Sequence, residues 1–273
     1  MYWQKRLDQP DKNEEMEKRI RQMFEEHQGN YGYRRITKAL QKQEFIINKK
    51  KVQRLMGKMG LLCLSYTRKS RKYSSYRGTI GTLAKNRLQR RFHTLIVHQK
   101  ITTDTTEFKY FEKDSNGTLH MRKAFLDPFL DMYKSEMMSY SFSKKPSAAS
   151  IMKALDEAIE VSSDCRYRRT FHSDQGWAYQ MKAYRHRLQE HGIFQSMSRK
   201  GNCLDNSPIE NFFGIIKQEM YHGKIYSSFE ELQLAVSNYI DYYNNKRIKE
   251  RLDWMSPVQF RKAKDGFLTS VSS

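Results

Sequence analysis

Between residues 95 and 216, short runs of apolar and β-branched residues alternate with longer amphipathic stretches. Runs of the first kind predict strands, and apolar residues at helical spacing predict helices. The sequence predicts three antiparallel strands, at 95–103, 118–126 and 132–142, followed by a helix at 147–159. A strand at 170–172, a helix at 178–191, a strand at 193–196 and a helix from 208 onward come next. This order predicts an α/β fold in which helices flank one mixed sheet. Ser147 is predicted to cap the helix at 147–159, and Ser256 to cap a last short helix that Pro257 begins.

The segment before the predicted sheet is expected to be helical. Apolar residues recur at helical spacing in 11–28, 31–40 and 48–60, and the last of these stretches is basic. Residues 1–62 are therefore interpreted as an all-α, helix-turn-helix-like DNA-binding module, or as a small helical bundle with a solvated basic face. The cations expected to contact DNA in the first case are Arg34, Arg35, Lys50, Lys51 and Arg54.

The chain carries 50 Lys and Arg against 30 Asp and Glu, a formal net charge of +20. That charge favours binding to a polyanion, for which nucleic acid is the common choice and a membrane surface the alternative. Residues 68–91 contain nine Lys or Arg and no acid. They are expected to form a linker that lies along phosphates, or a solvated tether. The predicted domains are a module at 1–62, a linker at 63–94, an α/β core at 95–225 and a C-terminal helical extension at 226–273.

Other classes of protein are disfavoured by the composition. No run of 18 or more apolar residues is present, so no segment is expected to span a membrane. The N-terminal residues lack the apolar core of a signal peptide. The three cysteines (Cys63, Cys165 and Cys203) are far apart and odd in number, which suits a reducing cytoplasm. Without a Cys-x-x-Cys pair or closely spaced histidines, a zinc knuckle is not expected.

Three acidic residues stand where a two-metal phosphoryl-transfer site needs carboxylates. Asp104 and Asp174 each follow a strand-like run. Glu210 lies at the start of a helix, and 35 residues separate it from Asp174. Hard cations such as Mg²⁺ prefer oxygen ligands, and a pair of them can activate a nucleophile and stabilise a leaving oxygen. Lys217 follows Glu210 by seven residues, so the two share a helix face on which Lys217 could contact a DNA phosphate.

Each acid also has a plainer interpretation. Ser207 and Glu210 have the spacing of a capping box, in which Glu210 would only satisfy a backbone N–H. Asp174 could be a turn residue, and Asp104 could cap a turn after its strand. His172, close to Asp174, is interpreted as structural. Taken one at a time, the residues leave the roles of the acids open.

Taken together, these motifs resemble the integrase-core transposases of bacterial insertion sequences. The similarity is to the second-reading-frame protein of the insertion-sequence-three family, in its one-fifty-like subgroup, and it extends over nearly the whole chain. The motifs that carry it are 31–36 and 52–56 in the N-terminal module, 103–108, 171–179, 195–206 and 210–217 around the acids, and 242–247 and 255–260 near the C-terminus.

The resemblance implies a ribonuclease-H-like fold in which Asp104, Asp174 and Glu210 are the catalytic residues and bind two Mg²⁺ or Mn²⁺ ions. It implies that water cleaves a strand at the ends of the element and that the exposed 3′-OH carries out strand transfer. The implied partners are double-stranded DNA, as element ends and as target, and a DNA-binding protein of the upstream frame, separate or joined by frameshifting. A homo-oligomer on DNA and a cytoplasmic, nucleoid-associated location are also expected.

Three functions therefore remain as hypotheses. The first is a transposase that uses the acid triad. The second is a non-catalytic DNA-binding regulator of the element, supported by the N-terminal module and the net charge of +20. The third is a general nuclease of the same fold, which would cleave DNA without joining strands.

Overall fold

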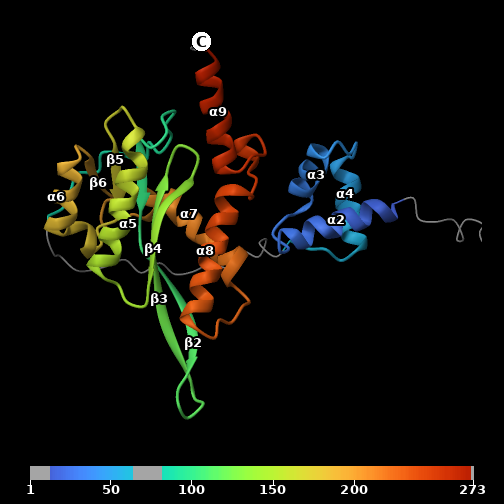
Figure 1. Ribbon diagram of the computed structural model, residues 1–273, viewed down its shortest axis with the longest axis horizontal. Helices are drawn as coiled ribbons and strands as arrows, with labels where there is room; N and C mark the ends of the chain where they lie inside the picture. The colour runs from blue at the N-terminus through green and yellow to red at the C-terminus, as the bar shows by residue number, and fades with distance from the viewer. Residues whose placement is uncertain (1–12, 64–81, 272–273) are drawn as a thin grey trace, which may run out of the picture. The chain divides into compact units, whose positions relative to one another are not determined.

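A computed structural model describes residues 13–63 and 82–271 (Figure 1). The chain divides into two compact units, Met1–Ser70 and Arg71–Ser273. In its described part, the smaller unit contains α2 (Glu14–Glu26), α3 (Tyr33–Lys42) and α4 (Lys49–Lys58). The apolar residues that recur at helical spacing are buried between these helices, as the amphipathic pattern predicts: Ile20, Met23, Ile36, Leu40, Val52, Leu55 and Met56.

The larger unit is built around a six-stranded sheet. Its strands are β1 (Lys100–Thr103), β2 (Thr106–Lys113), β3 (Leu119–Asp131), β4 (Glu136–Ser143), β5 (Thr170–Ser173) and β6 (Phe194–Met197). The long strand β3 pairs antiparallel with β1, β2 and β4, whereas β5 lies parallel to both β1 and β6. The path β2-β3-β1-β5-β6 puts β1 in the middle, beside the first of the parallel strands.

Helices cover both faces of this sheet (Figure 1). On one face, α5 (Ala148–Val161) and α6 (Lys182–Glu190) bury Ile101, Phe129 and Phe171 from the strands. On the other face, α7 (Ser207–Ile216) and α8 (Phe229–Asn245) pack on Leu126 and Leu130. The helix α9 and five short helical turns complete the described part: α9 (Pro257–Val271), η2 (Ser162–Asp164), η3 (Trp177–Gln180), η4 (Cys203–Asn206), η5 (Lys217–Tyr221) and η6 (Glu250–Leu252).

Two of the predicted helix starts are formed by the expected side chains. The Ser147 hydroxyl accepts a hydrogen bond from the Ser150 N–H at 3.1 Å, which caps α5. Before α9, the Ser256 hydroxyl accepts from the Gln259 N–H at 3.3 Å, and the Gln259 side chain accepts in return from the Ser256 N–H at 3.1 Å. The C-terminal helix is longer than the short one predicted, since α9 continues to Val271.

The predicted mixed sheet with flanking helices is confirmed, but its first strands were placed wrongly. Residues 95–97 are not part of a strand, because the Thr94 hydroxyl accepts from the Ile96 N–H and turns the chain, leaving Leu95 80% exposed. Residues 132–133 form a turn after β3. The strand β2 was missed: Phe108 and Tyr110 are buried while Lys109 between them is exposed, the alternation typical of a strand with one covered face.

Of the helices that the structure describes, none combines the length and the apolar character that a membrane-spanning segment needs.

Candidate active site

Asp104 and Asp174 lie side by side at the ends of two parallel strands. In the register of β1 and β5, Thr102 is paired with His172, so each aspartate follows two residues later at the same edge of the sheet. Neighbouring strands are about 5 Å apart, which brings the two backbones within reach of one ion. Both side chains are half-buried. Each is fixed by a backbone N–H, that of Thr105 to Asp104 Oδ1 at 2.7 Å and that of Gly176 to Asp174 Oδ1 at 2.8 Å.

Glu210 is brought to the same edge by a contact at the start of its helix. The Asn206 amide donates to the Thr103 carbonyl at 3.2 Å, and its oxygen accepts from the Thr102 hydroxyl. These bonds attach the beginning of α7 to β1, and Glu210 follows Asn206 by four residues, about one helical turn. The capping box expected as the plainer role is not formed, because Ser207 already has helical backbone angles and Asn206 precedes the helix.

The three carboxylates influence one another's ionisation. The pKa of Asp104 is well above its usual range because of burial and, next, because of the negative charge of Asp174, with a further contribution from Glu210. Burial also raises the pKa of Asp174. Burial and the charge of Asp174 raise the pKa of Glu210. Each group therefore resists becoming an anion, as expected for carboxyl groups that are partly buried and close to other acids.

Two buried residues beneath this edge were not identified from the sequence. Asp127 of β3 accepts from the Thr105 hydroxyl at 2.6 Å and from the Ser141 hydroxyl at 3.3 Å, and its charge adds to the rise in the pKa of Asp104. Tyr179 of η3 places its hydroxyl 3.5 Å from that of Thr103, and its pKa is raised by burial and then by the charge of Asp104. The one available signal was an acid inside the apolar run 124–130, which needs a buried partner.

Gly176 leaves no room for a side chain beside Asp174. A Cβ at this position would lie 2.9 Å from Asp174 Oδ1 and 3.4 Å from the Tyr179 ring. Replacing Gly176 by Ala is therefore expected to displace the Asp174 carboxylate and to lower the DNA cleavage that the family resemblance implies by about 10²-fold, the cost of a misplacement near 1 Å. Gly214→Ala is the matched control, because a Cβ there meets nothing within 4 Å. Equal cleavage rates for the two variants in a nicking assay would contradict this prediction.

Lys217 lies just beyond the C-terminal end of α7, the helix that carries Glu210, and comes close to Asp104. It begins the π-helical turn η5 directly after α7, and its Nζ donates to the Thr106 hydroxyl at 2.6 Å. The same ammonium lies 5.4 Å from the centre of the Phe108 ring. Thr106 is two residues beyond Asp104, so this hydrogen bond holds the ammonium of Lys217 near the first acid.

His172 is buried, and both of its ring nitrogens have hydrogen-bond partners. Its Nδ1 is 2.8 Å from the Ser196 hydroxyl, and its Nε2 is 2.8 Å from the Asp205 carbonyl. Burial lowers the pKa of His172 to about 4, so the ring is neutral at pH 7. This environment agrees with the structural role predicted for the residue.

The cations predicted to contact DNA differ in their surroundings within the smaller unit. Lys50, Lys51 and Arg54 are exposed on α4, and Arg34 is exposed at the start of α3. Arg35 instead turns inward: its Nη1 donates to the Asn30 carbonyl at 3.2 Å, and its guanidinium lies 5.5 Å from the centre of the Tyr31 ring. A DNA contact by Arg35 would compete with these internal contacts.

The chemistry of the three acids fits a hard divalent cation. They offer only oxygen ligands and are half-buried, and burial together with the charge of Asp174 raises the pKa of both Asp104 and Glu210. In the part of the chain that the structure describes, no three His, Cys, Asp or Glu side chains already form a group that could hold a metal ion.

Neutralising Asp104 is expected to stabilise the metal-free protein. When the pKa of a carboxyl is higher in the folded than in the unfolded chain, the folded protein loses stability as the pH rises from the unfolded to the folded pKa. The pKa of Asp104 is raised in this way, so its charge is unfavourable at pH 7. We expect Asp104→Asn to raise the Tm of the metal-free larger unit by about 2–4 °C. Mn²⁺ should raise the Tm of the unchanged protein more than that of the variant. A lower Tm for the variant, measured by calorimetry in the presence of chelator, would contradict this.

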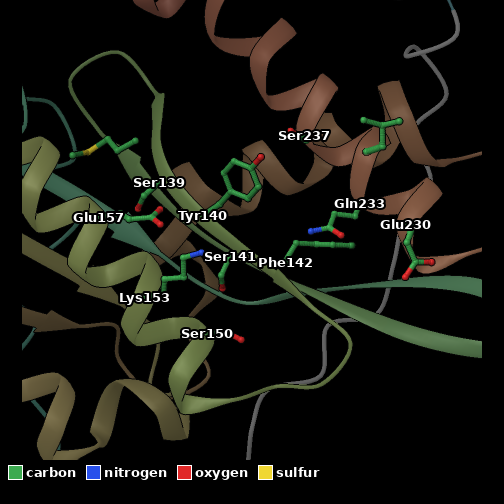
Figure 2. A pocket seen from close by; sticks show the side chains of 12 residues that line it. Ser139, Tyr140, Ser141, Phe142, Ser150, Lys153, Glu157, Glu230, Gln233 and Ser237 are labelled. Carbon is green, nitrogen blue, oxygen red and sulfur yellow. The ribbon is translucent and has the colours of Figure 1, made fainter.

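A groove of about 710 Å³ lies elsewhere on the larger unit, between β4, α5 and α8 (Figure 2). Figure 2 shows Tyr140 of β4, Lys153 of α5 and Gln233 of α8 around it. Its lining mixes hydroxyl groups, amide and both signs of charge, and it includes none of the three acids. The groove is therefore separate from the candidate active site.

Comparison with known protein families finds three matching models. A model described as an HTH-like domain matches residues 10–70, and two described as integrase core domains match residues 96–203 and 210–264. The two core models together include all three acids and Lys217.

Several bacterial proteins are similar over most of their length. The proposed transposase InsK for insertion sequence element IS150 of Escherichia coli K12 is 43% identical over 95% of this chain and 87% of its own length. A transposase-like protein of Haemophilus influenzae is 42% identical over 79% of this chain and 93% of its own. The transposase for insertion sequence element IS904 of Lactococcus lactis is 30% identical over 90% of this chain and 93% of its own.

Solved structures show more distant similarity. The integrase catalytic core of HTLV-2 in complex with magnesium gives a TM-score of 0.41 at 18% identity, over 57% of this chain and 92% of that one. The catalytic domain of Mos1 mariner transposase gives a TM-score of 0.41 at 14% identity, over 52% of this chain and 70% of that one.

Proposed function

This chain belongs to the family of insertion-sequence transposases with an integrase core, and we propose that Asp104, Asp174 and Glu210 are its catalytic residues. In this proposal the chain cleaves DNA at the ends of an insertion element and joins the exposed 3′-OH to target DNA. The observation that carries it is the gathering of three carboxylates at one sheet edge. Two follow the parallel strands β1 and β5, and the third is attached to β1 through Asn206.

The three carboxylates are proposed to hold two Mg²⁺ or Mn²⁺ ions. When bound, such ions activate the attacking water or 3′-OH and stabilise the leaving oxygen of the phosphodiester. Asp104 and Asp174 follow adjacent strands, and the charge of Asp174 acts on Glu210 of α7, which supports holding the ions jointly. The pKa of Asp104 is raised by burial and next by the charge of Asp174, with a smaller contribution from Glu210. The repulsion supports this assignment, because groups that repel one another as anions attract a cation.

Lys217 is proposed to contact a DNA phosphate beside the acids. Its ammonium is oriented by the Thr106 hydroxyl and the Phe108 ring, which limits the positions that it can take. An ammonium group carries three donors, so a bond to Thr106 is compatible with one to a phosphate oxygen. In the smaller unit, Lys50, Lys51, Arg54 and Arg34 are the exposed cations proposed to bind the backbone of double-stranded DNA.

The proposal includes the wider assembly that the family resemblance implies. Further copies of the chain on DNA, and the DNA-binding protein of the upstream frame as a separate chain or a fusion, are its expected partners. The net charge of +20 supports association with DNA and a place beside the nucleoid in the bacterial cytoplasm.

Labelled duplexes taken from the DNA on either side of the reading frame test this function. We expect the purified chain with Mg²⁺ or Mn²⁺ to nick them and then to join a pre-exposed 3′-OH to a second duplex. Tight binding without cleavage in either metal would favour a regulator of the element. Cleavage without joined products would favour a general nuclease of the same fold.

A further inference from the structure

Asp205 is a buried acid that the catalytic assignment does not use. Its side chain is 0% exposed and accepts hydrogen bonds from two arginines and an asparagine. Arg199 donates through Nε at 2.8 Å and through Nη2 at 3.0 Å, Arg90 through Nε at 2.9 Å, and Asn86 through Nδ2 at 3.0 Å. A buried carboxylate this thoroughly paired holds its neighbours in place, because removing either charge would leave the other without its partner.

Two of these donors come from a segment far away in the sequence. Residues 84–90, which we name the strap, lie within the predicted linker and run beside β6. The Arg87 N–H donates to the Ser196 hydroxyl at 2.9 Å, and the Ala84 N–H to the Met197 sulfur at 3.4 Å. The strap therefore covers the outer strand of the sheet and is part of the larger unit.

The strap ends in a strained turn that directs Arg90 at Asp205. Gln89 and Arg90 have φ of 48° and 62°, in the left-handed region that residues other than glycine rarely adopt. The Asn86 side chain stabilises the turn by accepting from the Gln89 N–H at 2.8 Å. Arg90 also donates to the Asn202 side chain at 3.2 Å, so it joins the strap to the loop that leads into η4. Such strain persists where the surrounding contacts require it.

Asp205 stands immediately before the residue that attaches the third acid to β1. Its carbonyl faces His172 Nε2 at 2.8 Å, and the next residue, Asn206, makes the bonds to Thr102 and Thr103. One turn later comes Glu210. The start of α7 is thus held on one side by β1 and on the other by the strap.

We propose that Asp205 and Arg90 are positioning residues for Glu210, and that the strap supports the active site by holding the start of α7 in place. The strap sets the start of α7, and α7 carries Glu210 to the edge where Asp104 and Asp174 lie. This inference rests on the proposed function, because it takes Glu210 as a metal ligand. Loss of the Arg90 contact leaves the carboxylate of Asp205 with Arg199, so the helix start loosens while the fold remains.

Calorimetric Mn²⁺ binding to the full chain, in a cycle with Glu210→Gln, tests this role without relying on catalysis. We expect Arg90→Gln to weaken Mn²⁺ binding about 10-fold in the otherwise unchanged chain, and Arg90→Lys to restore most of it. In the Glu210→Gln background, Arg90→Gln should have no further effect, since a positioning residue acts only through the group that it positions. Asp205→Asn should follow the same pattern with a larger loss.

Lys85→Ala is the matched control, because Lys85 is an exposed cation of the same strap and lies outside the Asp205 contacts. It should bind Mn²⁺ as the unchanged chain does, which separates positioning from a general loss of charge. Equal weakening by Arg90→Gln in both backgrounds, or no weakening in either, would overturn the positioning role. If Glu210→Gln alone left Mn²⁺ binding unchanged, the assignment of Glu210 as a ligand would fail instead, so the two failures are distinguishable.

Discussion

Replacing Asp174 by Asn is expected to lower metal-dependent nicking of element-end DNA by about 10³-fold or more, a loss of the size seen when catalytic groups are removed. The amide keeps the shape of the side chain, and its oxygen can still accept the Gly176 N–H that now reaches Asp174 Oδ1 at 2.8 Å. What it removes is the anionic charge that an ion between β1 and β5 would need. The variant should therefore fold and bind DNA while failing in both cleavage and strand joining.

Single-turnover nicking of a labelled duplex, with DNA binding measured on the same samples, checks this expectation. Asp241→Asn is a suitable control: Asp241 is exposed on α8 and bonded to Asn245 at 2.8 Å, away from the sheet edge. It should nick at the unchanged rate. Nicking by Asp174→Asn within a few-fold of the control would show that the carboxylate is not required, and the plainer role of a turn residue would then stand.

Replacing Arg247 by Ala is expected to destabilise the larger unit by about 3–5 kcal/mol, the cost of leaving a buried charge without its partner. The side chains of Arg247 and Glu219 are 6% and 2% exposed, and Arg247 Nε donates to Glu219 Oε2 at 2.7 Å. Tyr239 of α8 donates to the same oxygen at 2.9 Å. Because Glu219 lies in η5 with Lys217, this pair also fixes the turn that carries the proposed phosphate contact.

Urea unfolding followed by tryptophan fluorescence measures this loss. Arg122→Ala is the matched control, since Arg122 pairs with Glu112 at 3.6 Å with its side chain 58% exposed, and such surface pairs contribute about 1 kcal/mol or less. Replacing Arg247 and Glu219 together by apolar residues of similar size should recover much of the lost stability. A change below about 1 kcal/mol for Arg247→Ala would mean that the pair is not needed to hold α8 and η5 together.

The acids could be predicted from the sequence because each belongs to a local pattern. Asp104 and Asp174 end short strands, and in a sheet with parallel neighbours such ends meet at one edge. Glu210 could be added because it lies at the start of a helix. The resemblance to a known family then assigned the three acids to one metal-binding site. Local patterns also predicted the caps at Ser147 and Ser256, whose partners lie three residues away.

The contacts that hold the acids together could not be predicted in this way. Asn206 binds Thr102 across 104 residues of sequence, and Asp205 binds Arg90 across 115. Neither partner is marked by periodicity, and a buried polar pair is recognisable only when the fold brings both members together. The strap was interpreted as linker because it is basic and rich in polar residues, although part of its positive charge serves Asp205.

The strand β2 was missed for a different reason, because its signal was present. Phe108 and Tyr110 alternate with charged residues, but the run begins directly after Asp104, where the first strand was taken to end. The chain continues as a strand after the acid because β3 is long enough to pair with both β1 and β2 on one side. Asp104 therefore follows the end of β1 and lies just before β2 begins, so its strand end is not the end of the strand-forming sequence.

Anomalous X-ray diffraction from crystals of the full chain bound to an element-end duplex and Mn²⁺ tests the central claim most directly. The account predicts Mn²⁺ peaks bonded to carboxylate oxygens of Asp104, Asp174 and Glu210, next to the phosphate that is to be cut. It also predicts that the Asp174→Asn variant loses those peaks while keeping the DNA in place. Mn²⁺ bound elsewhere, with the three carboxylates in contact only with protein groups or water, would contradict it.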